Sequence, residues 1–247
     1  SPPKKYKTPL EKGDHPEIDS SEYLDETGIK HYLTMIGQLQ WCISLGRLDI
    51  FSACVTMSSF RIMPRIGHME RLKRIYGYLY DTKQAAIRVR VDEPDYSNFP
   101  DQMHDWASYI YGDVKEHIPD NIPETLGNPI VLTHYVDANL YHDVVTGRAL
   151  TAILHLINQT PFDWYCKRHA TVEMATFGSL FNAAKTAVEQ IIDIRSTLRY
   201  FGVPITGRSM MFGDNQSVFT NATIPHSQLN KRHLALAYHK VREAVAS

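Results

Sequence analysis

The sequence predicts a mixed α/β domain in the second half of the chain, preceded by a small helical segment. Three observations lead to this expectation. Apolar residues recur at helical spacing between residues 28 and 81, and short runs suited to β-strands begin at residue 130. One long amphipathic stretch separates the third of these runs from the fourth. The order expected from residue 130 onward is βββαβαα.

The composition is that of an ordinary globular protein. Of the 247 residues, 43% are hydrophobic and 21% are charged, which suffices for one large or two small domains. No run of 18 apolar residues occurs, and the first residues lack the apolar core of a signal peptide, so we expect a soluble intracellular protein. Cys42, Cys54 and Cys166 lack CxxC spacing, which favours reduced thiols over zinc ligands or disulfides. A net charge of −1 leaves any nucleic-acid binding to local basic patches.

Residues 1–84 are expected to form an extended lead-in followed by three helices. Up to residue 27 the chain is polar and rich in Pro, Asp and Glu, and we expect little core there. From residue 28 to residue 81 the apolar positions follow the spacing of amphipathic helices, with breaks near Gly46 and Pro64.

Residues 85–129 are expected to hold a strand and then a linker or insertion. Residues 85–91 alternate between apolar and polar at their end and are a candidate strand. Five prolines among acidic residues then predict irregular structure. The aromatic residues Trp106, Tyr109 and Tyr111 could stack on bases, but the favoured interpretation is that they pack the linker onto a domain.

Residues 130–247 are expected to form one domain around a sheet. The predicted strands are residues 130–137, 148–157, 162–167 and 208–213, with a turn at 158–161. The predicted helices are residues 173–200, 216–223 and 233–246. Gly202 and Pro204 end the long helix.

Two aspartates close the first and the fourth of these strands. Asp137 and Asp214 are candidates for a divalent-metal site, because hard cations prefer carboxylate oxygens. Each has a simpler alternative. Asp137 could be a turn residue that caps backbone amides, and Asp214 could cap the helix that follows it. The metal interpretation is favoured for both.

Five segments of the second half match, in order, motifs of one known family. They are a Tyr-Ser-Asp-Ala-Asp-like motif at residues 135–139, an Arg-Ser-Thr-Ser-Gly-like segment at 147–152, a Trp-Ser-Ser-Lys-Lys-like segment at 164–168, a Cys-Asp-Asn-Gln-Ser-like motif at 213–217, and a Lys-His-Ile-Asp-Ile-like tail at 232–243. This half resembles the ribonuclease H domain of copia-type long-terminal-repeat (LTR) retrotransposon polyproteins. The resemblance implies a ribonuclease H-like mixed sheet whose fifth strand is missing, because the chain ends before it.

The first half is similar to another part of the same polyproteins. Residues 32–39, 46–50 and 68–79 look like the helical connection between the reverse transcriptase and its ribonuclease H domain. The polymerase motif Tyr-x-Asp-Asp appears nowhere in the sequence. We therefore expect no DNA synthesis from this chain.

The resemblance implies two-metal hydrolysis of RNA in RNA/DNA hybrids, in which four acidic residues hold two Mg²⁺ ions about 4 Å apart. Asp137 and Asp214 would be the first and third of these catalytic ligands. The second should be a glutamate on the long helix, and Leu180 occupies its position. Glu173 and Glu189 lie too far along or around that helix to replace it. The fourth acid would follow the missing strand, so we expect Mg²⁺ binding to be weak or absent and the fragment to be inactive or nearly so.

Two groups of basic residues could contact nucleic acid. The denser group is near the end of the chain and comprises Lys231, Arg232, Lys240 and Arg242. The other comprises Arg71, Lys73 and Arg74, for which an ordinary solvated helix face is the favoured interpretation.

The resemblance also implies partners and a location. The expected partners are an RNA/DNA hybrid or another nucleic acid and the remainder of the reverse transcriptase polyprotein. The expected location is a cytoplasmic retroelement particle or the nucleus. Two alternatives to an impaired nuclease stay open: a non-catalytic nucleic-acid-binding module, and the product of a decayed element without function.

Overall fold

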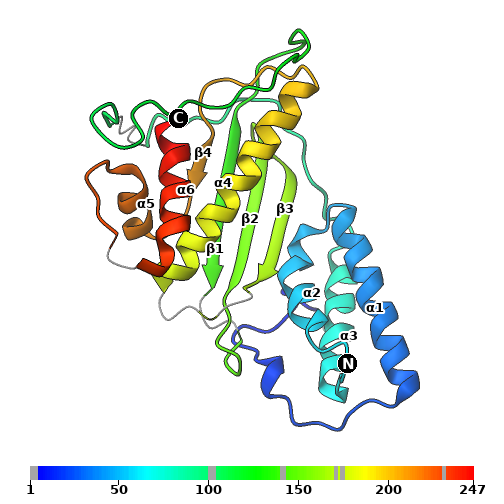
Figure 1. Ribbon diagram of the computed structural model, residues 1–247. Coiled ribbons are helices and arrows are strands. Elements are labelled where there is room, and N and C mark those ends of the chain that lie inside the picture. Colours follow the sequence, from blue (N-terminus) through cyan, green and yellow to red (C-terminus); the bar gives the residue numbers. More distant parts are fainter. Residues whose placement is uncertain (1–4, 100–103, 140–142, 170–171, 173–175, 230–231) are drawn as a thin grey trace. The chain divides into compact units, whose positions relative to one another are not determined.

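The computed structural model describes residues 5–99, 104–139, 143–169, 172, 176–229 and 232–247 (Figure 1). The chain divides into two compact units. Unit 1 comprises Ser1–Arg88, Tyr141–Arg148 and Cys166–Ala170, and unit 2 comprises Val89–Leu140, Ala149–Tyr165 and Thr171–Ser247. In the described part of the chain, no helix is long and apolar enough to cross a membrane.

Unit 1 contains the three predicted helices. They are α1 (Glu26–Ser44), α2 (Phe51–Ser58) and α3 (Ile66–Asp81), with short 3-10 turns η1 (Pro16–Ile18) and η2 (Leu48–Ile50). The Asp25 side chain accepts a hydrogen bond from the Gly28 amide and so caps the start of α1. Gly46 follows the end of α1 with φ of 103°, a conformation that favours glycine. Fully buried side chains from all three helices and from η2 form the core of this unit: Tyr32, Ile36, Leu39, Ile50, Met57, Leu72 and Ile75.

The prediction of a strand at residues 85–91 is wrong. These residues belong to no strand, and Val89 and Val91 are largely exposed. The segment is held by isolated contacts instead, because the Arg90 amide donates to Thr160 Oγ1 and the Asn158 side chain donates to the Val91 carbonyl. Alternation alone does not make a strand when neither face of the segment is buried.

Unit 2 is built on a mixed sheet of four strands, ordered β3-β2-β1-β4. The strands are β1 (Leu132–Asn139), β2 (Leu150–Ile157), β3 (Thr160–Arg168) and β4 (Met210–Phe212). β1 pairs antiparallel with β2 and parallel with β4. β3 follows β2 after two residues, as in a hairpin, and it begins two residues earlier than the predicted turn of residues 158–161 would allow. The sheet confirms the expected ribonuclease H-like arrangement.

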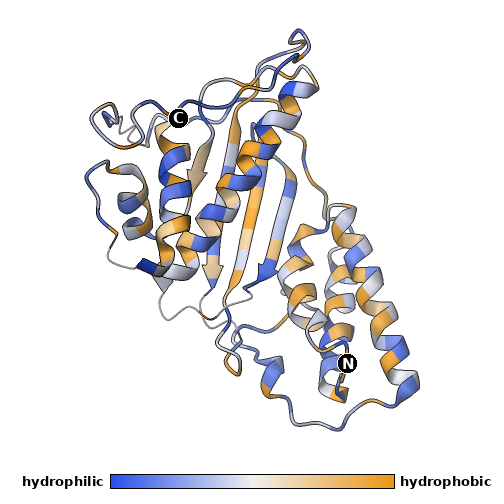
Figure 2. Ribbon diagram, in the orientation of Figure 1, coloured by the Kyte–Doolittle hydropathy of each residue, from blue (hydrophilic) through white to orange (hydrophobic). Residues whose placement is uncertain are grey.

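The helices of unit 2 follow the predicted order. They are α4 (Thr176–Tyr200), α5 (Gln216–Thr223) and α6 (Ala235–Ala246), with η3 (Arg232–Leu234) before α6. α4 packs on β1 and β2, and α6 packs beside α4 (Figure 1). Both helices show hydrophobic and hydrophilic positions along their length, as amphipathic helices do (Figure 2).

The core of unit 2 lies between the sheet and these helices. Its members include Val136, Ala138, Ile153, Leu180, Phe181, Ala184, Val188, Val218, Tyr238 and Val241. From residue 135 onward β1 is buried on this side and exposed on the other, because Val136 and Ala138 are buried whereas Tyr135, Asp137 and Asn139 are exposed. The alternation fixes which side of the sheet carries Asp137.

Candidate functional site

Asp137 and Asp214 come to neighbouring positions at one edge of the sheet. β1 and β4 run parallel, and Tyr135 of β1 is paired with Phe212 of β4. Extending this register by two residues places Asp214 opposite Asp137, beside the carboxyl ends of both strands. The backbones stay close there, because a Cβ added to Gly213 would lie 3.1 Å from the Val136 carbonyl oxygen. Adjacent strands are roughly 5 Å apart, which is within reach for two carboxylates to share one cation.

Neither carboxylate is used to stabilise the described part of the fold. Asp137 and Asp214 are exposed, and neither makes a hydrogen bond or ion pair with the described residues. The alternative in which Asp214 caps α5 is wrong, because Asn215 is the cap and its side chain accepts from the Val218 amide at 3.1 Å. Asp137 likewise accepts no bond from a backbone amide in that part of the chain.

The rest of the expected ligand set is not assembled among the described residues. Leu180 is 6% exposed and packs in the same cluster as Val136 and Ala138, on the covered face of β1. Glu189 is exposed and lies 3.4 Å from Lys185 Nζ on α4. Glu173 lies outside the described residues. No group of three or more His, Cys, Asp or Glu side chains suited to a metal ion occurs in the described part. Of the expected ligand set, the described residues supply Asp137 and Asp214 alone.

The aromatic residues beside the carboxylates were missed by sequence reasoning. Tyr135 precedes Asp137 by two residues on the same side of β1, is 49% exposed and stacks on Phe212, with ring centroids 5.5 Å apart. Phe99 lies 4.9 Å from Phe212, and the Tyr96 hydroxyl hydrogen-bonds Thr133 Oγ1. The i, i+2 spacing of Tyr135 and Asp137 was the available signal.

Three of the four basic residues predicted near the chain end lie among the described residues. Arg232 is exposed at the start of η3. Lys240 is half-exposed on α6, and its Nζ lies 3.6 Å from Glu243. Lys231 lies outside the described residues. Of the predicted four, Arg232 and Lys240 are thus described and at least partly exposed.

The expectation for Arg242 needs correction, because this residue is 3% exposed. Its guanidinium donates to the carbonyls of Asn221, Ile224 and Pro225 at 2.6 to 2.8 Å. It also lies 4.9 Å from the ring centroid of Trp106. A guanidinium enclosed in this way is not free to contact nucleic acid.

The aromatic linker residues supply part of that enclosure. Trp106 and Tyr111 are buried and meet edge to face at 6.0 Å. The Tyr111 hydroxyl also hydrogen-bonds His239 of α6. The favoured interpretation, packing of the linker onto a domain, is confirmed for these two residues.

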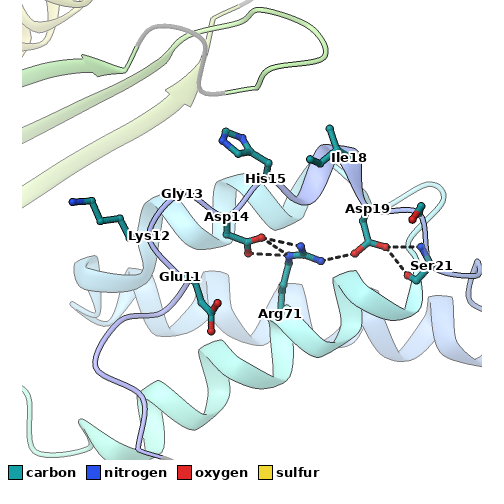
Figure 3. Close-up of a pocket in the computed structure, with 10 residues that line it drawn as sticks. Glu11, Lys12, Gly13, Asp14, His15, Ile18, Asp19, Ser21 and Arg71 are labelled. Atoms are coloured by element: carbon teal, nitrogen blue, oxygen red, sulfur yellow. Dashed lines mark hydrogen bonds and ion pairs between the residues drawn. The ribbon is translucent and has the colours of Figure 1, made fainter.

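The basic face of α3 in unit 1 is likewise occupied (Figure 3). Arg71 forms ion pairs with Asp14 at 2.8 Å and Asp19 at 2.6 Å, and Arg74 pairs with Glu11 at 2.8 Å. These hydrogen bonds and ion pairs raise the pKa of Arg71, and the Arg71 and Ser21 bonds to Asp19 outweigh its burial and lower the pKa of that carboxyl to about 2. A hollow of about 660 Å³ beside them is lined by the same charged groups. The N-terminal segment therefore supplies the partners of Arg71 and Arg74, whereas Lys73 pairs with Glu70 on its own helix.

Comparisons with known proteins point to one class of polyprotein, although no family model matches the chain. The Pol polyprotein of transposon RE1 from Arabidopsis thaliana is 22% identical over 216 residues, which is 87% of this chain. The RE2 polyprotein from the same plant is 21% identical over 216 residues, again 87% of the chain. The putative transposon Ty5-1 protein of Saccharomyces cerevisiae is 36% identical over 62 residues, covering 25% of this chain and 20% of its own length.

Two further facts set the scope of these likenesses. The chain spans only 12% of the length of the RE1 and RE2 polyproteins. Among solved structures, ribonuclease H1 from Halobacterium salinarum is 17% identical and covers 46% of this chain and 76% of its own, with a TM-score of 0.34. That score is too low to support a fold assignment, which rests on the strand order and register of unit 2. By its sequence, the chain is similar to the Pol polyproteins of the transposons RE1 and RE2 and, over a shorter stretch, to a putative protein of transposon Ty5-1.

Proposed function

We propose that unit 2 binds RNA/DNA hybrid at the sheet edge that carries Asp137 and Asp214, and that it cuts the hybrid slowly or not at all. The observation that supports this proposal is the parallel register of β1 and β4, which, extended by two residues, would set Asp137 opposite Asp214; both are exposed and have no hydrogen bond or ion pair with the described residues. Arg232 and Lys240 are the basic residues of this unit that would meet the phosphate backbone. Homology to retroelement polyproteins makes a hybrid the fitting substrate class.

The metal chemistry of the proposal is limited by the donor set. Asp137 and Asp214 would hold one Mg²⁺, whose role is to stabilise negative charge on a phosphate oxygen. Two carboxylates bind hydrated Mg²⁺ weakly, and Leu180 offers no oxygen in place of a third. The chain's own contribution is then to position the phosphate at the sheet edge, without a full two-metal site.

A non-catalytic binding module is the second candidate. The burial of Leu180 among apolar side chains favours it, because a core leucine at this position suits packing and not catalysis. Such a module would bind the duplex by contacting its phosphates and by recognising the shape of its grooves. The two candidates differ only in turnover, so slow cleavage that EDTA blocks would favour the first, and its complete absence would favour the second.

The test combines binding and cleavage of a labelled RNA/DNA hybrid by the full chain, with Mg²⁺ or Mn²⁺ and with EDTA. We expect salt-dependent binding and no measurable cleavage. Asp137→Asn and Asp214→Asn should abolish any effect of Mg²⁺ on binding, whereas Asp163→Asn, an exposed aspartate of β3, should not. Robust cleavage that EDTA blocks would refute the impaired state. Absence of hybrid binding at low salt would refute the nucleic-acid role.

Unit 1 fits the proposal as a structural connection. We propose that residues 1–84 correspond to the connection before the ribonuclease H domain, residues 85–129 to a linker, and residues 130–247 to the domain itself. The remainder of a Pol polyprotein would then be the protein partner. Limited proteolysis of the full chain should cut first within residues 85–129 if this division holds.

A further inference from the structure

Two histidines lie side by side in the interior of unit 2, and nothing in the proposed function uses them. His134 of β1 and His155 of β2 are directly paired across the strands, and both are fully buried. Their Nδ1 atoms are 2.7 Å apart, and their ring centroids are 4.9 Å apart. His155 Nε2 lies 3.0 Å from Oε1 of Gln190 on α4. The pair thus links two strands to the helix that covers them.

The geometry fixes which nitrogens carry protons. A carbonyl oxygen only accepts, so His155 Nε2 must donate to Gln190 Oε1. In a neutral ring the other nitrogen, His155 Nδ1, is then an acceptor. The hydrogen bond between the rings therefore requires a proton on His134 Nδ1. His134 Nε2 is left as a bare acceptor, and it has no partner among the described residues.

A further proton has no suitable place in this arrangement. On His155 Nδ1 it would set two N–H groups against each other across 2.7 Å. On His134 Nε2 it would create a buried donor without an acceptor in the described part. Burial, with the neighbouring ring and Arg195 of α4, lowers the pKa of His134 to about 3, and burial lowers that of His155.

The groups on the surrounding elements agree with a neutral pair. Gln190 and Arg195 face it from α4, and Arg195 itself pairs with Glu116 at 2.6 Å. β4 contributes the uncharged Met211 opposite His134. Asp163 of β3 is the one charged group in the described part that favours protonation of His155, and it does not overcome burial.

We propose that His134 and His155 form an acid-sensitive catch, which holds α4 on the centre of the sheet only while both rings are neutral. Acidification breaks the hydrogen bond between the rings and the contact to Gln190, and it loosens the strand that carries Asp137. The unfolded chain binds protons at both histidines below about pH 6.5, whereas the folded chain does not. Stability is therefore highest above that pH and is lost as the pH falls. His134, whose pKa in the folded chain is about 3, costs roughly 20-fold in the folding equilibrium constant between pH 7 and pH 5, and His155 adds a loss in the same direction.

The first test is nitrogen-15 NMR of the histidine rings in the full chain. We expect a proton on Nδ1 of His134 and on Nε2 of His155, with both rings neutral at pH 5.5. An imidazolium signal from either ring at that pH would overturn the proposal. This measurement needs no variant to fold.

The second test is denaturant unfolding of the full chain at pH 7 and pH 5. Between pH 7 and pH 5, the folding equilibrium constant of the wild type should fall at least roughly 20-fold more than that of His134→Val/His155→Val. The loss in His155→Gln should be intermediate. His226→Asn, which replaces an exposed histidine of the same unit, should behave as the wild type. Protection of β1 and β2 amides from hydrogen exchange, corrected for intrinsic rates, should fall at pH 5 in the wild type only. If the folding equilibrium constant falls equally between pH 7 and pH 5 in the wild type and the double variant, the proposal is overturned.

Discussion

Truncation of Arg242 distinguishes a structural guanidinium from a nucleic-acid contact. The side chain is 3% exposed and makes three hydrogen bonds to the carbonyls of Asn221, Ile224 and Pro225, which lie at and just after the end of α5. Its guanidinium carbon also lies 4.8 Å from the ring centroid of Tyr238 and 4.9 Å from that of Trp106. Arg242→Ala removes all of these contacts at once.

The expected loss follows from these contacts. A hydrogen bond to a charged group contributes about 1.5–3 kcal/mol, and a cation–π contact that is shielded from water contributes up to about 2 kcal/mol. The contributions are not additive, because water enters the cavity and solvates some of the carbonyls. We therefore expect Arg242→Ala to lower the free energy of unfolding by about 3–5 kcal/mol.

The assay is urea denaturation of the full chain at pH 7, read by tryptophan fluorescence, alongside hybrid binding measured at urea concentrations where the variant stays folded. Arg242→Lys keeps the charge but not the planar fork, so its loss should be intermediate. Lys240→Ala is the matched control on the same helix and should change stability by less than about 0.5 kcal/mol while weakening binding. An Arg242→Ala protein as stable as the wild type, with binding weakened as in Lys240→Ala, would refute the structural role.

Three further predictions concern other buried or paired groups. His68 is buried, accepts from the Arg65 amide and bonds the Pro16 carbonyl, so His68→Ala should cost unit 1 about 1–2 kcal/mol in chemical denaturation at pH 7. Ion pairs with two arginines of α4 outweigh the burial of Glu116 and lower its pKa to about 2. The stability it adds is present above its unfolded pKa and lost as the pH falls towards 2, so Glu116→Gln should be less stable than wild type at pH 7 and equal to it near pH 2, as measured by urea titrations. Leu180→Glu should cost about 2–4 kcal/mol, because it buries a carboxylate, and should not by itself restore hybrid cleavage. Leu180→Ala is its control for lost packing, and cleavage regained by Leu180→Glu alone would contradict the need for a fourth acid.

Local periodicity was sufficient for most of the elements. The helices of unit 1 and the order βββαβαα of unit 2 follow from apolar spacing, and strand ends differ from the prediction by about two residues. The segment 85–91 shows where such reasoning fails. It alternates like a strand, but Val89 and Val91 are exposed, so no packing partner stabilises the extended conformation with a ladder of hydrogen bonds. Alternating apolar and polar residues favour an extended conformation, but a β-strand forms only where a neighbouring strand pairs with it.

The sequence by itself indicated the resemblance to copia-type polyproteins, the two candidate carboxylates and the leucine that replaces an expected acid. Motifs and residue identities are local, so they can be read without knowing what packs against them. The tertiary structure alone decided that Asp137 and Asp214 share an edge, because the register of β1 with β4 joins segments separated by the whole of α4. It also decided that Arg242 is interior, because the rings that enclose it include Trp106, from a linker far earlier in the chain. Exposure and pairing depend on such distant contacts, which no local pattern reports.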